Sequence, residues 1–493
     1  MKVPAADHAT LPRSNPGVQP QALVEPVWRN DAFALAAATS SGALSARQAV
    51  EASLARLAEV NPHLNAVVLT LAEQALAAAD AADTKRRSGA PLPPLHGVPV
   101  TIKVNIDQSG CPTDNGVVAN RNLMATEDNP VVANLRRAGA IIVGRTNTPA
   151  YSMRWFTDNA LHGATRNPWD PRHTCGGSSG GAAAATAAGI TPIAHGNDIA
   201  GSVRYPAYCC GIFGLKPSYG RVPSFNASYK GLSPISSQLM AVQGPLARTV
   251  RDLRLAFAAF AVPDPRDPRC IEPAPFAPAP PPIRVALVER LGDDKFHPAV
   301  ATAMAAAARA LEQAGYRVEP AQPPELCFAA ELWPRLAMPD LIVPLEPLIA
   351  QHGDDGVKRA VELWRRVWPQ RDPADVLIAL GERLRLLRLW QEFLTRYPLI
   401  LMPASTEPPF EVDADLRDEA TTAAIIAAQR PLTAISLLGL PAIAAPTGVW
   451  NGLPTGVQLV AGPFREDLCF DAAAAIEARL PLALPVEPGR EVP

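Results

Sequence analysis

The stretch "CGGSSGGAAAA", residues 175–185, decides how the rest of this chain is interpreted. Four glycines surround two serines, and a run of alanines with high helix propensity follows them. Such a composition is compatible with a flexible linker, with a phosphate-binding loop, or with a loop that holds a serine for catalysis. The flanking sequence discriminates between these hypotheses, because each of them makes a different demand on it.

Three common interpretations fit the flanks poorly. A linker needs polar, structureless neighbours, whereas a turn-rich segment precedes this stretch and a helix former follows it. A phosphate loop needs a lysine after its last glycine, but Gly181 is followed by Ala182. A nucleophile elbow needs a strand directly before the serine, and Pro168 and Pro171 disfavour a central strand there.

A second serine supplies a fourth hypothesis. Ser202 lies in the segment "HGNDIAGSVRYP" and follows the small residues Ala200 and Gly201, which let the backbone turn tightly. Tight turns allow backbone N–H groups to converge on one point, as an oxyanion hole requires. Upstream, Lys103 lies within an apolar run. Two glycine-framed serines and a lysine are the side chains needed for a serine nucleophile that is activated by lysine rather than histidine.

Composition narrows the class of protein. The chain has 493 residues, of which 48% are apolar and 19% charged, so it can bury a large core. Its net charge of −2 gives no indication of nucleic acid or an anionic membrane as partner. The cysteines and histidines lack the spacing of a zinc site, and we expect no metal. No apolar run reaches the roughly 18 residues of a membrane span, and the first residues lack the apolar core of a secretory signal, so we expect a cytoplasmic protein.

Helix and strand signals alternate through the first half of the chain. Ser45 and Gln48 form a capping box at the start of a helix that we expect to end at Asn61-Pro62. Residues 129–147 predict a helix, a glycine stop and then a buried strand. This order of helix and strand favours the α/β class.

The ends and the second half have distinct compositions. Residues 1–27 lack periodicity and predict a loose arm. Residues 262–282 are rich in proline and predict either a domain boundary or a long surface connection. Residues 325–400 are predicted to be mostly helical, and residues 440–462 to form short apolar strands with Gly/Pro turns. The helical region carries four tryptophans, which belong either to the core or to the wall of an aromatic substrate pocket: Trp333, Trp364, Trp368 and Trp390.

Four segments together resemble the amidase signature family of serine hydrolases. They are, in chain order, "HGVPVTIKVNID" (96–107), "HGATRNPWDPRHTCGGSSGGAAAATAAG" (162–189), "GNDIAGSVRYPAYCCGIFGLKPSYGRVP" (196–223) and "LPAIAAPTGVWNGLPTGVQLVAG" (440–462). The resemblance covers roughly residues 30–480 and is densest between residues 96 and 223. Motifs that occur in this order are far more specific than one glycine-rich loop.

The resemblance implies the architecture. The family has an α/β fold, a mixed twisted central sheet covered by helices on both faces. A single amidase domain is then expected over residues 28–485, with residues 486–493 as a C-terminal tail. On this basis residues 262–282 are a surface connection, and residues 325–400 form a mostly helical region on the substrate side.

The resemblance also assigns roles to residues of the matching motifs. Ser202 resembles the nucleophile, Ser178 the serine that follows a cis peptide bond, and Lys103 the catalytic lysine. The oxyanion hole is implied at the backbone N–H groups of four residues, Ile199, Ala200, Gly201 and Ser202. Residues expected to support the site are Gly177, Ser179, Asp198 and Arg204. The last two are expected to pair and brace the loop, or to contact substrate, and no cofactor is implied.

Three residues depart from the family pattern. Val104 follows the lysine where Asp is usual, Asn197 stands where Thr or Ser is more frequent, and Ala200 replaces a common Gly. An alanine keeps its N–H group but narrows the site slightly. We therefore expect catalysis to be retained, with altered hydrogen bonding around Lys103 and Ser202.

The implied activity is hydrolysis of a carboxylic amide C–N bond, with esters or carbamates as further candidates. Lysine has an ordinary pKa of about 10.4, and burial of Lys103 between Ile102 and Val104 lowers it, so that the neutral amine takes a proton from Ser178 and Ser178 takes one from Ser202. The expected partner is a small amide with a hydrophobic or aromatic group, and a homodimer is left open. The alternatives are a transamidating amidotransferase A-type subunit that acts with partner subunits, and a catalytically silent binding protein.

Overall fold

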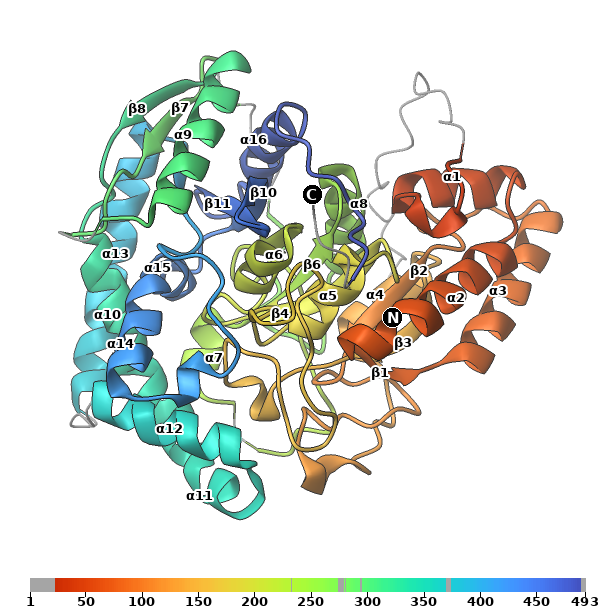
Figure 1. The fold of residues 1–493 in the computed structure, drawn as a ribbon, viewed down its shortest axis with the longest axis horizontal. Helices are drawn as coiled ribbons and strands as arrows, with labels where there is room; N and C mark the ends of the chain where they lie inside the picture. The colour runs from red at the N-terminus through yellow and green to blue at the C-terminus, as the bar shows by residue number, and fades with distance from the viewer. Residues whose placement is uncertain are drawn as a thin grey trace, which may run out of the picture.

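The computed structural model describes residues 23–231, 233–273, 279, 281–292, 295–368 and 374–488. Within these ranges one sheet of eleven strands crosses the molecule, with β1 at one end and β7 and β8 at the other (Figure 1), in the order β1-β3-β2-β4-β6-β5-β10-β11-β9-β7-β8. The strands are β1 (Val67–Thr70), β2 (Pro99–Lys103), β3 (Ile141–Thr146), β4 (Ile193–Asp198), β5 (Phe213–Lys216), β6 (Val242–Ala247), β7 (Arg284–Leu287), β8 (Arg317–Pro320), β9 (Leu399–Pro403), β10 (Ala442–Trp450) and β11 (Leu453–Ala461).

Helices connect and cover these strands. They are α1 (Ala32–Ser41), α2 (Ala46–Leu64), α3 (Ala72–Arg87), α4 (Pro130–Arg137), α5 (Gly180–Ala187), α6 (Arg204–Cys210), α7 (Ile235–Met240), α8 (Val250–Phe260), α9 (Pro298–Gln313), α10 (Leu326–Ala337), α11 (Val343–His352), α12 (Asp355–Val367), α13 (Ala374–Arg396), α14 (Glu419–Ala428), α15 (Arg430–Leu438) and α16 (Glu466–Glu477). A π-helical turn, Met338–Ile342, joins α10 to α11.

The sheet is mixed and buried on both faces. Strand β2 runs parallel to β3 and β4, whereas β4 runs antiparallel to β6 and β10 pairs antiparallel with β5 and β11. Successive residues of β9 alternate between two cores: Leu399 and Leu401 pack with α8, α9 and α16, and Ile400 and Met402 pack with α10, α13 and α15. The predicted fold class, a mixed sheet with helices on both faces, is confirmed.

The structure corrects one predicted helix end. The capping box of Ser45 and Gln48 is present, but α2 continues through Pro62 to Leu64. Proline lacks an N–H group, which costs a hydrogen bond within a helix. Here Asn61 offsets the disruption, because its side-chain oxygen accepts from the N–H groups of two residues beyond the helix end, Ala66 and Val67, at 2.9 Å each. The helix ends where Asn65 adopts a left-handed conformation.

The structure also bears on the other predicted helices, strands and segment boundaries. The helix and strand expected within 129–147 are α4 and β3, and 325–400 is mostly helical as predicted. Residues 440–462 form longer strands than expected, since β10 and β11 make one hairpin. The single domain over 28–485 stays a prediction. Of the predicted N-terminal arm only residues 23–27 fall within the described ranges, and the last five residues of the predicted tail lie outside them.

The alanine run after the opening stretch forms a buried element. Every residue of α5 is buried, and the helix packs against β4 and α6 with side chains no larger than threonine. Small side chains let the helix approach the sheet closely, so the two serines before α5 are fixed relative to β2 and β4. A flexible linker is excluded by this packing.

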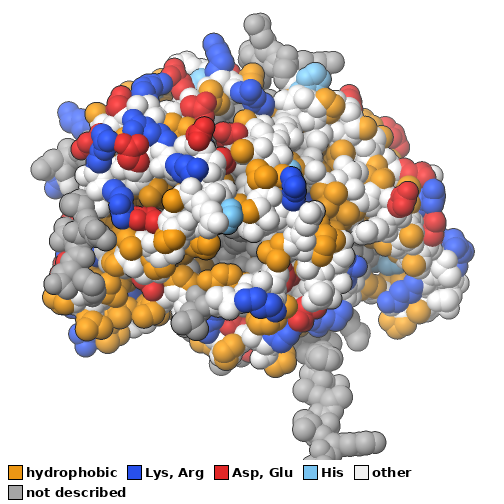
Figure 2. Space-filling view, turned by 90° about the horizontal axis from the view of Figure 1, so that it is seen from below, with side chains coloured by type: hydrophobic (Ala, Val, Ile, Leu, Met, Phe, Trp, Pro, Cys, Tyr) orange, Lys and Arg blue, Asp and Glu red, His pale blue; other side chains and the backbone are white. Residues whose placement is uncertain are grey.

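The surface seen in Figure 2 carries acidic and basic side chains that are interspersed, together with contiguous hydrophobic stretches. In the described part of the chain, no helix combines the length and the apolar character that crossing a bilayer requires.

Candidate active site

Lys103 ends strand β2 and is completely buried. Its Nζ lies 2.8 Å from Oγ of Ser178, 3.0 Å from Oγ of Ser179 and 2.8 Å from Oδ1 of Asn197. Burial lowers the pKa of Lys103 well below its ordinary value, although the charge of Asp198 opposes this shift. Burial therefore disfavours the ammonium form, and the neutral form has two N–H donors and one lone pair.

The partners of Lys103 determine where that lone pair points. The amide of Asn197 donates through Nδ2 to Oδ1 of Asn105 at 3.0 Å, so its own Oδ1 can only accept from Lys103. The hydroxyl of Ser179 lies 3.4 Å from the carbonyl oxygen of Asn197, to which it donates. If Lys103 gives one N–H to Asn197 and the other to Ser179, its lone pair faces Ser178. In this arrangement a neutral Lys103 can accept a hydrogen bond from the Ser178 hydroxyl.

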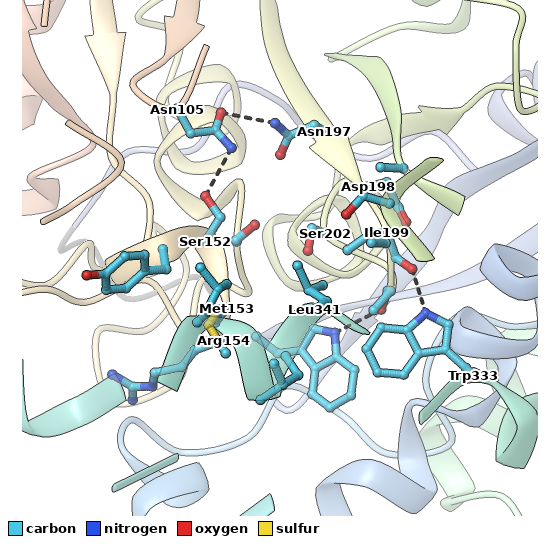
Figure 3. Close-up of a pocket in the computed structure, with 18 of the residues that line it drawn as sticks. Asn105, Ser152, Met153, Arg154, Asn197, Asp198, Ile199, Ser202, Trp333 and Leu341 are labelled. Atoms are coloured by element: carbon cyan, nitrogen blue, oxygen red, sulfur yellow. Dashed lines mark hydrogen bonds between the residues drawn. The ribbon is translucent and has the colours of Figure 1, made fainter. Parts of the chain in front are cut away.

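An amide network holds Asn197 in this orientation. Asn105, two residues after Lys103, donates through Nδ2 to Oγ of Ser152 at 3.0 Å, and that hydroxyl donates to Asn115 at 2.6 Å (Figure 3). Because each amide in the chain is fixed at both ends, the acceptor oxygen of Asn197 stays directed at the amine. The departure at position 197 thus supplies an acceptor in place of the hydroxyl more frequent there.

The two glycine-framed serines meet at one cavity. Ser178 and Ser202 are both nearly buried and both line it, and the N–H of Ser179 donates to the carbonyl of Ser202 at 3.1 Å. The peptide bond between Gly177 and Ser178 is cis, as the resemblance implied. Among the described residues none forms a hydrogen bond with Oγ of Ser202, so this hydroxyl is available to the cavity.

A buried ion pair braces the loop before Ser202. The Arg204 guanidinium donates to both carboxylate oxygens of Asp198 at 3.0 Å, and both side chains are fully buried. Although burial raises the pKa of a carboxyl group, this guanidinium holds the pKa of Asp198 at about 2. Asp198 also accepts from the N–H of Gly201 at 2.7 Å and of Val203 at 3.2 Å. One carboxylate therefore fixes the backbone on both sides of Ser202.

These contacts reduce the number of backbone N–H groups that are free to form the predicted oxyanion hole. The N–H of Gly201 already donates to Asp198, so in this structure it is not free for an oxyanion. The N–H groups of the other three predicted residues, Ile199, Ala200 and Ser202, have no acceptor among the described residues. Gly201 instead contributes its backbone conformation, with φ of 102°, and a side chain there would collide with Leu432.

The cavity beside Ser202 has a volume of about 220 Å³ and an aromatic wall. Trp333, Trp364 and Trp368 line it, and ring centroids in this group lie 6.0 and 6.2 Å apart. The three tryptophans line this cavity, and Trp333 and Trp364 are at the same time buried in the core, while a role of the cavity in substrate binding stays a prediction. The fourth, Trp390, is buried in the core and donates its N–H to the carbonyl of Pro324.

Sequence reasoning missed several residues of the cavity. Asn105, Ser152 and Trp155 line it together with aliphatic side chains from the π-helical turn, Leu341 and Ile342 (Figure 3). Asn105 follows the lysine within its motif and could have been found from that position. The other four lie in segments without a motif, and only the tertiary fold brings them to the site.

Comparison with known proteins agrees with this geometry. Residues 48–470 match the family described as Amidase. The chain belongs to the amidase family. It is 46% identical over 460 residues to an indoleacetamide hydrolase of Bradyrhizobium diazoefficiens, covering 92% of this chain and 87% of that protein. A solved bacterial aryl acylamidase of the amidase signature family superposes with a TM-score of 0.78 at 26% identity, covering 92% of this chain and 97% of the other.

Relatives of the alternative class are less similar to this amidase. The A-type subunit of glutamyl-tRNA(Gln) amidotransferase from Chloroflexus aggregans is 31% identical over 469 residues, covering 87% of this chain and 92% of that protein. The higher identity to a hydrolase supports the predicted activity over the transamidating alternative. The protein is an amidase that hydrolyses a carboxylic amide C–N bond, and its partner is an amide substrate.

Breaking the buried ion pair should destabilise the protein strongly. Replacing Asp198→Asn removes the charge that compensates Arg204, and we expect the free energy of unfolding to fall by about 3–5 kcal/mol. The control is Glu51→Gln, which breaks an exposed pair with Arg47 and should change the free energy of unfolding little. Urea unfolding of the two variants measures both values, and equal losses would contradict the bracing role of Asp198.

Proposed function

We propose that this amidase hydrolyses primary amides of arylacetic acids, the class that includes indole-3-acetamide, through Lys103, Ser178 and Ser202. One observation carries the proposal: Lys103 is buried and bonded to Ser178, which lines a cavity whose opposite wall is made of tryptophan rings. The name of the 46% identical relative supports the aryl group. An aryl ring packs well on indole faces, and the hydroxyl groups of Ser178 and Ser202 in the lining offer polar contacts to an amide.

Acylation moves two protons in sequence. Among the described residues Oγ of Ser202 has no hydrogen bond, so it first turns to within hydrogen-bond reach of Oγ of Ser178. It then bonds to the amide carbon while its proton passes to Oγ of Ser178, and the proton of Ser178 passes to Nζ of Lys103. The carbonyl electron pair moves to oxygen, where free backbone N–H groups stabilise the charge, one donor being worth roughly 3 kcal/mol. When the carbonyl re-forms, the C–N bond breaks. The proton returns from Lys103 through Ser178 to nitrogen, and ammonia leaves.

Deacylation reuses the same groups. Water attacks the acyl carbon, and its proton passes through Ser178 to Lys103. Collapse of the second tetrahedral intermediate breaks the bond to Ser202, which recovers its proton from the relay. The product is an arylacetic acid, and no group other than the chain's own residues and water takes part in this sequence.

A substrate panel on wild type and Ser202→Ala tests the nucleophile and the substrate class together. The panel contains indole-3-acetamide, phenylacetamide, acetamide, an anilide, a p-nitrophenyl ester and a carbamate. We expect the two arylacetamides to have the highest kcat/KM, and the variant to lose turnover on every compound and labelling by a fluorophosphonate. Turnover that survives in Ser202→Ala would refute the assigned nucleophile. A preference for acetamide would refute the aryl class while leaving the nucleophile intact.

Removing the lysine should affect amides more than esters. Ammonia is a poor leaving group that needs the returned proton, whereas p-nitrophenolate leaves without one. In Lys103→Ala we expect kcat/KM for phenylacetamide to fall at least about ten-fold further than for the ester. Steady-state kinetics on both substrates measures the ratio, and equal losses would exclude proton return through Lys103.

A carboxylate beside Lys103 should move the pH dependence of activity. Activity requires the neutral amine, so kcat/KM rises as pH increases through the pKa of Lys103. Asn197→Asp places a negative charge at the position of Oδ1, which favours the ammonium form and raises that pKa. The acidic limb of the pH profile should shift to higher pH. Asn197→Ser, which adds no charge, is the matched control, and an equal shift in both variants would contradict a charge effect.

The proposal places the enzyme in a reducing compartment, the cytoplasm. Six of its seven cysteines, Cys111, Cys175, Cys209, Cys210, Cys270 and Cys469, are free thiols in the structure. A homodimer stays a prediction, which sedimentation of the purified chain tests.

A further inference from the structure

The indole N–H groups of two tryptophans donate hydrogen bonds to the loop that precedes Ser202. Trp333 donates through Nε1 to the carbonyl oxygen of Ile199 at 2.8 Å, and Trp155 donates through Nε1 to that of Ala200 at 2.9 Å. The two acceptors are consecutive carbonyls. Both indole rings also line the cavity, and in Figure 3 Ile199 lies between Trp333 and Ser202.

Because a peptide unit is planar, each of these hydrogen bonds also sets the direction of the N–H group in the same peptide unit. In a trans peptide the C=O and N–H bonds point in opposite directions, and both units here are trans. Holding the carbonyl of Ile199 toward Trp333 directs the N–H of Ala200 the other way. Holding the carbonyl of Ala200 toward Trp155 directs the N–H of Gly201 away from Trp155, and there it meets Asp198.

The N–H groups of Gly201 and Ala200 therefore have different partners. The N–H of Gly201 donates to Asp198 and braces the loop. That of Ala200 has no acceptor among the described residues and is available for an oxyanion. We infer that Trp333 is a positioning residue, which orients the N–H of Ala200 for the transition state while its ring forms part of the aryl-binding wall; Trp155 orients the neighbouring peptide in the same way. This inference rests on the proposed function.

An indole hydrogen bond to a backbone carbonyl does not by itself identify a positioning residue, because other tryptophans of the chain form one away from the cavity. Trp169 and Trp390 also donate to carbonyls, of Cys210 and Pro324, but neither ring lines the cavity. Conversely, Trp364 and Trp368 line the cavity, and no hydrogen bond of their N–H groups occurs among the described residues. Only Trp155 and Trp333 combine the two features among the described residues.

Because Trp333 bonds to the loop whereas Trp364 and Trp368 only line the cavity, the three residues supply matched variants. Trp333→Phe keeps an aromatic ring and removes the N–H, whereas Trp364→Phe and Trp368→Phe trim the same wall without touching the loop. We expect Trp333→Phe to raise KM about as much as the two control variants, because it trims the same wall, and in addition to lower kcat about ten-fold, since losing one hydrogen bond costs about that factor. The two control variants should change mainly KM.

A second readout isolates the oxyanion. An aryl trifluoromethyl ketone forms a tetrahedral oxyanion on a serine nucleophile, so its affinity should fall in Trp333→Phe by the same factor as kcat, beyond what trimming the ring costs. A substrate-like aryl methyl ketone should lose only the affinity that trimming the ring costs, as it does in Trp364→Phe. If Trp333→Phe fails to fold, benzothienylalanine at position 333, which replaces the N–H with sulfur, makes the same test with the ring shape kept.

The outcomes separate this inference from the proposed substrate. A kcat of Trp333→Phe equal to wild type, or a change confined to KM as in the two controls, would overturn the positioning role. If wild type rejects arylacetamides, the proposed substrate class fails, and the same kcat and inhibitor comparison is made with whichever amide of the panel it hydrolyses.

Discussion

The active site depends on one buried amine. Nζ of Lys103 is shut off from water and surrounded by three oxygen atoms within 3.0 Å, belonging to Ser178, Ser179 and Asn197. A charged ammonium at this position would lose its hydration without a carboxylate in contact, whereas a neutral amine fits two acceptors and one donor. Desolvation thus lowers the pKa of this lysine, as the proposed role of a base requires. The oxygen atoms around it decide which proton it can accept.

The fold creates this environment through three neighbouring segments. Strand β2 ends at Lys103, the parallel strand β4 ends at Asp198, and α5 starts directly after the two serines. The all-small composition of α5 lets it approach the sheet, so Ser178 and Ser179 reach the end of β2. The Asp198–Arg204 pair then fixes the loop that carries Ser202 beside them. A dry site of this kind requires that every polar group has a partner, which explains the density of amide and hydroxyl contacts there.

The sequence was sufficient for part of this picture. Local motifs singled out Lys103, Ser178 and Ser202, and the resemblance to the amidase signature family implied their roles and the mixed central sheet. The alternation of helix and strand by itself favoured only the α/β class. The indole contacts could not be predicted, because Trp333 and Trp155 bond to residues 134 and 45 positions away. The same holds for Asn105 and Asn197, which are 92 positions apart. The end of α2 was predicted two residues too early, because a local contact of the Asn61 side chain with the N–H groups of Ala66 and Val67 offsets the effect of Pro62.

The most direct test of the central claim is the ionisation state of Lys103 itself. Nitrogen-15 NMR of lysine-labelled protein, with Lys103→Met to assign the signal, follows the Nζ resonance across neutral and alkaline pH. The account predicts a neutral-amine signal for Lys103 at pH 7. A signal that stays that of an ammonium up to about pH 10, the ordinary range of lysine, would contradict it.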